Sequence, residues 1–201
     1  GALGLAILSS VAFSTIGDLA ATGDTGPAAL TEGYADAFMV GAGIAVHLAE
    51  SGHRIVATDI DGAAAARVAH GIEAAGGRSY ATALDVANSG AVAALFADPN
   101  TGPVDVVINN AGLQYVSRLE DFDSARWQLL VNVMLVGAAN MMRAALPAMR
   151  ARGHGRIVNI GSIHSLVASP YKSAYIAAKH GLIGLSKSVA LENGDVDITV
   201  N

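Results

Sequence analysis

The 201-residue chain contains no cysteine, so it has no disulfide framework, no thiolate metal site and no cysteine nucleophile. Charged residues are also scarce, at 14% against roughly 25% in an average soluble domain. The formal net charge is -5, and no run of lysine or arginine occurs. The six histidines form no pair at metal-ligand spacing. These absences argue against a metal site and against binding to nucleic acid or to an anionic membrane, so we expect a small-molecule partner.

The residues that are present describe one globular domain. Apolar residues make up 52% of the chain, whereas aromatic residues make up only 5%. The interior must therefore be built from alanine, valine, isoleucine, leucine and glycine, and disorder is excluded. The lack of cysteine fits a reducing compartment, and we expect a cytoplasmic protein.

The N-terminal segment differs from the rest of the chain. Residues 1–17 carry no charge and approach the roughly 17 residues needed to cross a bilayer. Their glycine, serine and alanine content, the lack of an initiating methionine and the absence of any lysine or arginine before Arg54 argue against membrane insertion or a signal peptide. We interpret residues 1–27 as an atypical apolar tail, either disordered or foreign to the fold, and residues 28–201 as the domain.

From about residue 40 onward, short apolar runs alternate with alanine-rich stretches of helical period. The predicted strands are Arg54–Asp59, Tyr80–Leu84, Val104–Asn109, Arg156–Ile160 and Ile198–Asn201. The predicted helices are Gly41–Ser51, Ala63–Ala75, Ser89–Ala97, Ala125–Arg152 and Ser173–Leu191. This alternation predicts an α/β fold with a doubly wound parallel sheet, in which a ligand binds at the carboxyl ends of the strands.

Two groups of residues follow predicted strands closely enough to meet a cofactor. Asp59 lies about 18 residues after Gly41, where a carboxylate can accept hydrogen bonds from the two hydroxyls of an adenosine ribose and repel a 2′-phosphate. This favours NAD over NADP, although a solvated aspartate at a strand end would look the same. The segment from Asn109 to Gly112 has small residues that let the backbone approach a flat cofactor.

The candidate catalytic residues lie toward the end of the chain. Tyr175 and Lys179 are four residues apart on a predicted helix and therefore share a face. The phenol needs its pKa lowered by roughly 3 units to act as a base at neutral pH, and a nearby ammonium in a dry cleft supplies much of that effect. Ser162 follows a strand and lies 13 residues before the tyrosine, so its hydroxyl could hold a substrate oxygen.

Taken together, these motifs resemble the short-chain dehydrogenase/reductase family over residues 40–201. The resemblance implies a Rossmann fold, hydride transfer between NAD and a secondary alcohol or ketone, and a homo-oligomer, either dimer or tetramer. It also implies Ser162, Tyr175 and Lys179 as catalytic residues. The implied cofactor-binding residues are Gly41, Asp59, Asp85, Val86, Asn109, Ala111, Gly112, Tyr175 and Lys179.

A narrower resemblance points to the 3-hydroxybutyrate dehydrogenases within that family. It rests on the segments 111–114, 162–169, 172–175 and 179–181. It implies that Gln114, His164 and Lys172 hold the carboxylate of the substrate. An amide, an imidazole and an ammonium near a tyrosine base independently suit a small hydroxy acid.

The sequence departs from the family pattern at three places. The family's glycine-rich turn between its first strand and first helix retains Gly41, but Ala35 and Met39 occupy its earlier glycine positions. An alternative register through Thr31, Gly33, Gly41 and Gly43 needs an insertion. Met134 occupies the position of the usual catalytic asparagine, while Asn132 lies roughly 200° away around the helix. The pattern stops at Asn201, before the family's last turn, lid and strand, so we expect an incomplete domain.

Three hypotheses for function stay open at this point. The first is an NAD-dependent enzyme that interconverts 3-hydroxybutyrate and acetoacetate. The second is a reductase of another small ketone or of a 3-oxoacyl thioester. The third is a non-catalytic, degenerate dehydrogenase fragment, or a dimerisation module built on the two long helices.

Overall fold

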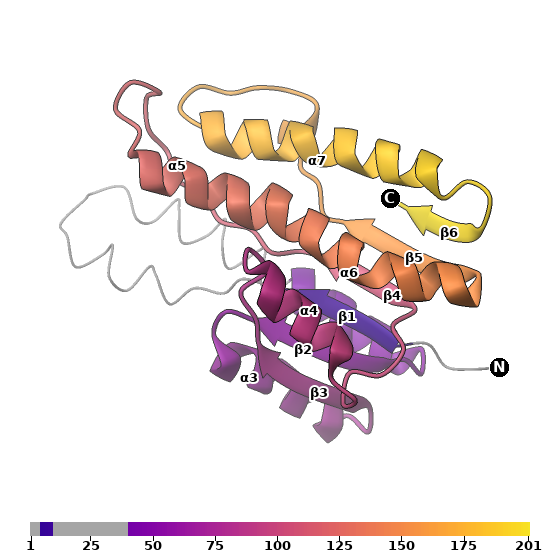
Figure 1. Ribbon diagram of the computed structural model, residues 1–201. Helices are drawn as coiled ribbons and strands as arrows, with labels where there is room; N and C mark the ends of the chain where they lie inside the picture. Colours follow the sequence, from indigo (N-terminus) through magenta and orange to yellow (C-terminus); the bar gives the residue numbers. More distant parts are fainter. Residues whose placement is uncertain (1–4, 10–39) are drawn as a thin grey trace.

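The computed structural model describes residues 5–9 and 40–201. Its centre is a six-stranded sheet with the strand order β3-β2-β1-β4-β5-β6 (Figure 1). Every pairing in the sheet is parallel. This order and direction are those of a doubly wound Rossmann sheet, as the sequence predicts.

The strands are short and mostly follow the predicted runs. Their bounds are β1 Leu5–Ser9, β2 Arg54–Asp59, β3 Arg78–Ala83, β4 Val106–Asn109, β5 His154–Asn159 and β6 Asp197–Val200. The predicted strands differ from these bounds by at most a few residues. The largest differences lie at the starts of β3, β4 and β5.

The helices also follow the predicted stretches. A helix over Val40–Glu50 precedes β2. The others are α3 Gly62–Ala74, α4 Ser89–Ala97, α5 Ser124–Val131, the π-helix η1 Asn132–Val136, α6 Gly137–Arg152, the 3-10 turn η2 Ile163–Ser165 and α7 Ser173–Glu192. Side chains at the N-caps of α3, α4 and α5 accept hydrogen bonds from backbone amides in the first turns, which fixes where these helices begin.

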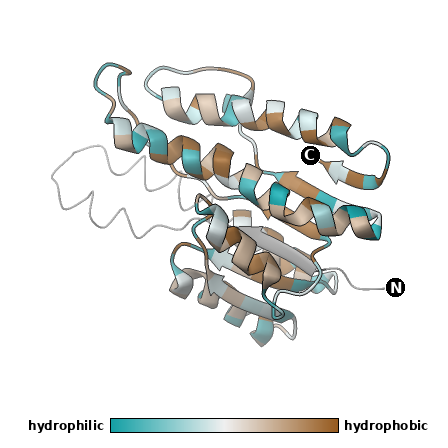
Figure 2. Cartoon of the chain, in the orientation of Figure 1, coloured by the Kyte–Doolittle hydropathy of each residue, from teal (hydrophilic) through white to brown (hydrophobic). Residues whose placement is uncertain are grey.

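The helices cover the sheet in two layers. Alternate strand residues point to opposite faces, so Val56 and Val107 pack with α4, α6 and α7, whereas Ile55 and Ile108 pack with Val40–Glu50 and α3. Hydrophobic residues accordingly recur along both strands and helices (Figure 2). Both faces of the central strands are buried, which explains their nearly continuous apolar sequences.

Strand β1 corrects the predicted boundary between tail and domain. Residues 5–9 lie within the segment 1–27 that the sequence set apart, yet they pair with β2 on one side and with β4 on the other. A central strand in a parallel sheet is apolar throughout, so its sequence resembles a tail or a membrane segment. The domain therefore includes residues from before position 28, and the rest of segment 1–27 lies outside the described residues.

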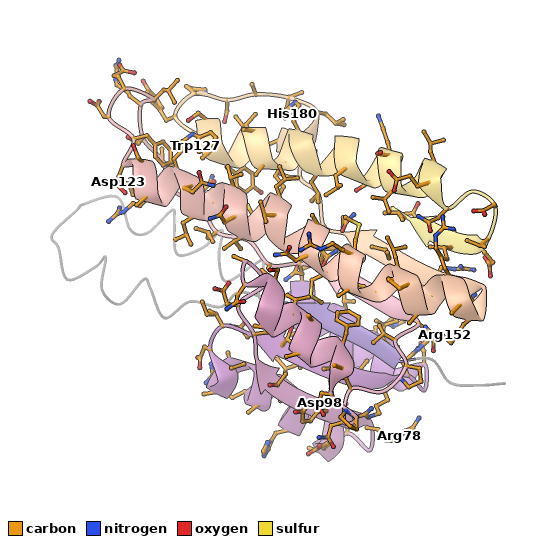
Figure 3. All side chains as sticks on the ribbon, in the orientation of Figure 1. Arg78, Asp98, Asp123, Trp127, Arg152 and His180 are labelled. Atoms are coloured by element: carbon orange, nitrogen blue, oxygen red, sulfur yellow. The ribbon has the colours of Figure 1, made fainter. Side chains whose placement is uncertain are left out.

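The helices α5, η1 and α6 join into one helix over Ser124–Arg152. It is long and apolar enough to cross a membrane by composition, and half of its most apolar window is buried within the protein. Its far end is tied to the sheet by Arg152, which donates to the carbonyl of Val104 and lies 3.4 Å from the Asp105 carboxylate (Figure 3). In this fold the helix is a core element packed on the sheet.

Candidate active site

The strand register brings the predicted site residues to one edge of the sheet. Asn109, at the end of β4, is in register with Ser9 of β1 and with Asn159 of β5. Asp59 ends β2, which lies on the other side of β1. The carboxyl ends of these four strands therefore form a continuous edge, where a doubly wound sheet binds its ligand.

Lys179 lies buried beneath this edge, on α7. Only 6% of the residue is exposed, and its Nζ donates a hydrogen bond of 2.6 Å to the carbonyl of Ile160, just after β5. The same Nζ lies 5.8 Å from the ring centroid of Tyr175, one turn earlier on the helix. Burial lowers the pKa of Lys179 to about 8, so the ammonium still predominates at neutral pH.

Ser162 and His164 lie in the turn after β5. Ser162 caps η2, where its Oγ accepts the amide hydrogen of His164 at 3.2 Å and its amide donates to Ser165 Oγ at 3.0 Å. This capping fixes the hydroxyl and leaves its proton to donate. The His164 ring meets the Tyr175 ring edge-on, with centroids 6.0 Å apart and planes at 90°.

The other two predicted carboxylate ligands lie on separate segments. Gln114 is partly buried in the loop after β4, and Lys172 is the N-cap residue of α7. Of the three predicted ligands, His164 is the one in ring contact with Tyr175.

The predicted cofactor-binding residues line the same edge. Asp59 is buried, and its Oδ1 accepts the amide hydrogen of Asp61 at 2.9 Å. Asp85 is exposed in the loop after β3, where its Oδ1 accepts from the amide of Ala87 at 2.9 Å. Gly41 is buried in the first turn of the helix Val40–Glu50. The earlier positions of the glycine-rich turn, including Ala35 and Met39, lie outside the described residues.

A small cavity of about 10 Å³ lies between β4, η1 and α7. A cavity of this size holds about one water molecule. Its lining includes the predicted site residues Val86, Asn109, Ala111 and Lys179. Gly112 follows Ala111 directly in the sequence. A Cβ at position 112 would lie 3.9 Å from Met134, so the space beside this glycine is not crowded.

The same cavity is lined by Met134, at the sequence position where the family resemblance places a catalytic asparagine. Met134 is buried. Asn132 instead accepts a hydrogen bond of 2.8 Å from Gln128 Nε2 in an exposed pair. The family position therefore carries a thioether, which cannot act as a proton donor.

A buried polar chain lies behind the site, and sequence reasoning did not identify Asn159 and Ser186 as its members. Asn109 Nδ2 donates to Asn159 Oδ1 at 2.7 Å, and Asn159 Nδ2 donates to Ser186 Oγ at 2.8 Å. The chain links β4, β5 and α7 and so fixes the helix that carries Tyr175 and Lys179. A polar residue at the end of each buried strand was the signal for it. Among the described residues, no group of His, Asp and Glu side chains could hold a metal ion.

Comparison with known proteins gives the same family as the motifs. The sequence profile of the short chain dehydrogenases matches residues 37–201. The D-beta-hydroxybutyrate dehydrogenase of Rhizobium meliloti (strain 1021) is 50% identical over 100 residues, which cover 50% of this chain and 39% of that protein. The enzyme of the same name from Cupriavidus necator is 37% identical over 164 residues, which cover 81% of this chain and 64% of that protein.

A solved structure extends the likeness to three dimensions. A metagenomic short-chain oxidoreductase, crystallised in complex with NADP, is 35% identical to this chain with a TM-score of 0.76. The match covers 79% of this chain and 73% of that structure. The matches span less than two thirds of the length of each of the two hydroxybutyrate dehydrogenases. Because the family profile matches residues 37–201, the chain belongs to the short-chain dehydrogenase family.

Proposed function

We propose that the chain carries the cofactor site and the catalytic residues of an NAD-dependent dehydrogenase, with 3-hydroxybutyrate and acetoacetate as its substrate pair. The observation that carries this proposal is the arrangement of Tyr175 between a buried ammonium and an imidazole at the carboxyl edge of the sheet. We also propose a homo-oligomer, as the family resemblance implies, and a cytoplasmic location, which the lack of cysteine supports.

The proposed chemistry assigns a separate task to each side chain. A bound nicotinamide would accept the hydride from the carbinol carbon. The Lys179 ammonium stabilises Tyr175 as the phenolate, which removes the hydroxyl proton and becomes the neutral phenol. Ser162 donates a hydrogen bond to the reacting oxygen and holds it beside the phenol.

The buried carboxylate of Asp59 supports NAD over NADP. At the end of β2 it can accept hydrogen bonds from ribose hydroxyls, whereas a 2′-phosphate would place two negative charges in contact. The structural relative was crystallised with NADP, so the choice of dinucleotide needs a direct test. Parallel titrations with NADH and NADPH should give at least tenfold tighter binding of NADH; equal affinities would contradict this assignment.

The substrate assignment rests on His164, Gln114 and Lys172. One imidazole, one amide and one ammonium can together hold a carboxylate close to the tyrosine. A 3-oxoacyl thioester has no carboxylate at that place. The two substrates can therefore be separated by His164→Ala, which should reduce turnover of 3-hydroxybutyrate much more than turnover of a ketone without a carboxylate.

The central test measures oxidation of 3-hydroxybutyrate with NAD by the wild-type chain and by Tyr175→Phe. The substitution removes only the phenolic oxygen, and we expect turnover to fall by roughly 10³-fold or more while NADH affinity is retained. Tyr171→Phe is the matched control, because Tyr171 is exposed four residues earlier. NADH binding without turnover in the wild-type chain would favour a non-catalytic protein, for which the thioether of Met134 gives a structural reason.

A further inference from the structure

Asn140 is a buried polar residue on an apolar face of α6. Only 5% of it is exposed, and its neighbours Met141 and Met142 are fully buried. Its Nδ2 donates to the carbonyl of Val86 at 3.0 Å and reaches the carbonyl of Ala87 at 3.4 Å. Its Oδ1 accepts a hydrogen bond of 2.9 Å from an Arg143 Nη. The amide is thus fully engaged, and both of its donor contacts go to one loop.

The loop that Asn140 holds connects β3 to α4. Gly137 lies one turn before Asn140 and lets Val86 approach the helix closely, since a Cβ at position 137 would lie 2.6 Å from Val86 Cγ2. Within the loop, the carboxylate of Asp85 accepts the amide hydrogen of Ala87. Gly137 and Asn140, which lie one turn apart on the helix Ser124–Arg152, therefore both contact this loop and fix the backbone of residues 85–87.

This loop lies at the adenosine end of the proposed cofactor site. The amide of Leu84 donates to the carbonyl of Asp59 at 2.8 Å, so the loop begins beside the proposed ribose ligand. The Val86 carbonyl is turned toward α6, whereas Asp85, one residue earlier in the loop, is exposed.

We propose that Asn140 is a positioning residue for the adenine half of the dinucleotide, acting through the backbone of Val86 and Ala87. The inference rests on the proposed function, because it requires that the chain bind NAD. Asn140 itself touches no substrate. Its effect should appear only in ligands that contain adenine.

The test compares NADH, ADP-ribose and reduced nicotinamide mononucleotide as ligands of the full chain. Asn140→Leu keeps the shape of the side chain but removes both donor contacts. We expect the dissociation constants of NADH and ADP-ribose to rise about tenfold, and that of the mononucleotide to stay within about twofold. Asn193→Leu is the matched control, since Asn193 is equally buried and donates to the Val189 carbonyl at the far end of α7.

A second variant covers the case in which Asn140→Leu does not fold. Gly137→Ala places a methyl group against Val86 and should produce the same selective loss for the adenine-containing ligands. An equal loss for all three ligands, or no loss for NADH and ADP-ribose, would overturn the inference while leaving the proposed function intact. Failure of the wild-type chain to bind NADH at all would overturn both.

Discussion

Lys179 combines a charge with burial, and its position has a cost in stability. Burial lowers the pKa of the folded-state ammonium to about 8, whereas an exposed lysine titrates near 10.5. Between these values the unfolded chain binds more protons than the folded chain, so the free energy of unfolding should rise with pH in that window. Below pH 8 the charge stays buried, and the folded state carries a cost on the order of 3 kcal/mol.

We therefore predict that Lys179→Met stabilises the protein at pH 7 while abolishing turnover. The gain should be about 1–3 kcal/mol, because removal of the buried charge is offset in part by loss of the hydrogen bond to Ile160. It should shrink as the pH rises from 8 to 10.5. Urea unfolding at several pH values measures it, with Lys187→Met, on the exposed side of the same helix, as control. A destabilised variant at pH 7, or a gain that does not depend on pH, would contradict the prediction.

At the scale of single residues, the sequence proposed the candidate site residues but not most of the contacts that support them. The strand-end rule and the motif spacing led to Tyr175, Lys179 and Ser162, because chemistry in a doubly wound sheet collects at one edge. Asn140 gave no such signal in the sequence. Its role depends on which loop packs against α6. Asn140 lies 54 positions after Val86 and 53 positions after Ala87, so no local sequence pattern predicts these hydrogen bonds.

At the scale of elements, periodicity predicted the helices and five strands because their apolar faces are set by burial. Strand β1 was missed because a short apolar strand of five residues has the same composition as an apolar tail, and the regular pattern began only at about residue 40. The π-helix Asn132–Val136 was missed for another reason. Its pairing, with the Gly137 amide donating to the Asn132 carbonyl, is a local register change that the 3.6-residue period does not encode.

The contact between α6 and β5 gives a prediction about packing. A Cβ at Gly155 in β5 would lie 2.5 Å from Met149 Sδ and 2.9 Å from Met149 Cβ, and Met149 is fully buried. Gly155→Ala should therefore destabilise the fold by about 1–3 kcal/mol through overpacking. Gly71→Ala is the matched control, because open space surrounds that helical position in α3 and alanine should stabilise it by up to about 1 kcal/mol. Thermal unfolding of both variants decides the point; equal effects would mean that Met149 can move aside.

At the scale of the whole molecule, one surface is more apolar than a lone domain needs. Leu129 in α5 is 46% exposed and Val136 in η1 is 38% exposed, and both lie on the side of the helix Ser124–Arg152 that the core does not cover. Helix α7 packs beside α5 and η1, and its exposed residues Ala177 and Gly184 are small. His180 lies between them on the outer side of α7 (Figure 3). Small and apolar residues on two adjacent helices allow a second pair of helices to approach closely.

This surface is where the proposed homo-oligomer should form, with two copies pairing through α5 and α7. Leu129→Glu would place a charge in the contact, and we expect the dissociation constant of the dimer to rise on the order of tenfold or more. Sedimentation velocity over a concentration series measures the change. Ile60→Glu is the control, because Ile60 is equally exposed but follows β2 on the other side of the sheet from α7. Equal weakening by both substitutions would place the interface elsewhere. A wild-type chain that remains monomeric would contradict the proposed homo-oligomer and leave the apolar faces of α5 and α7 to another partner.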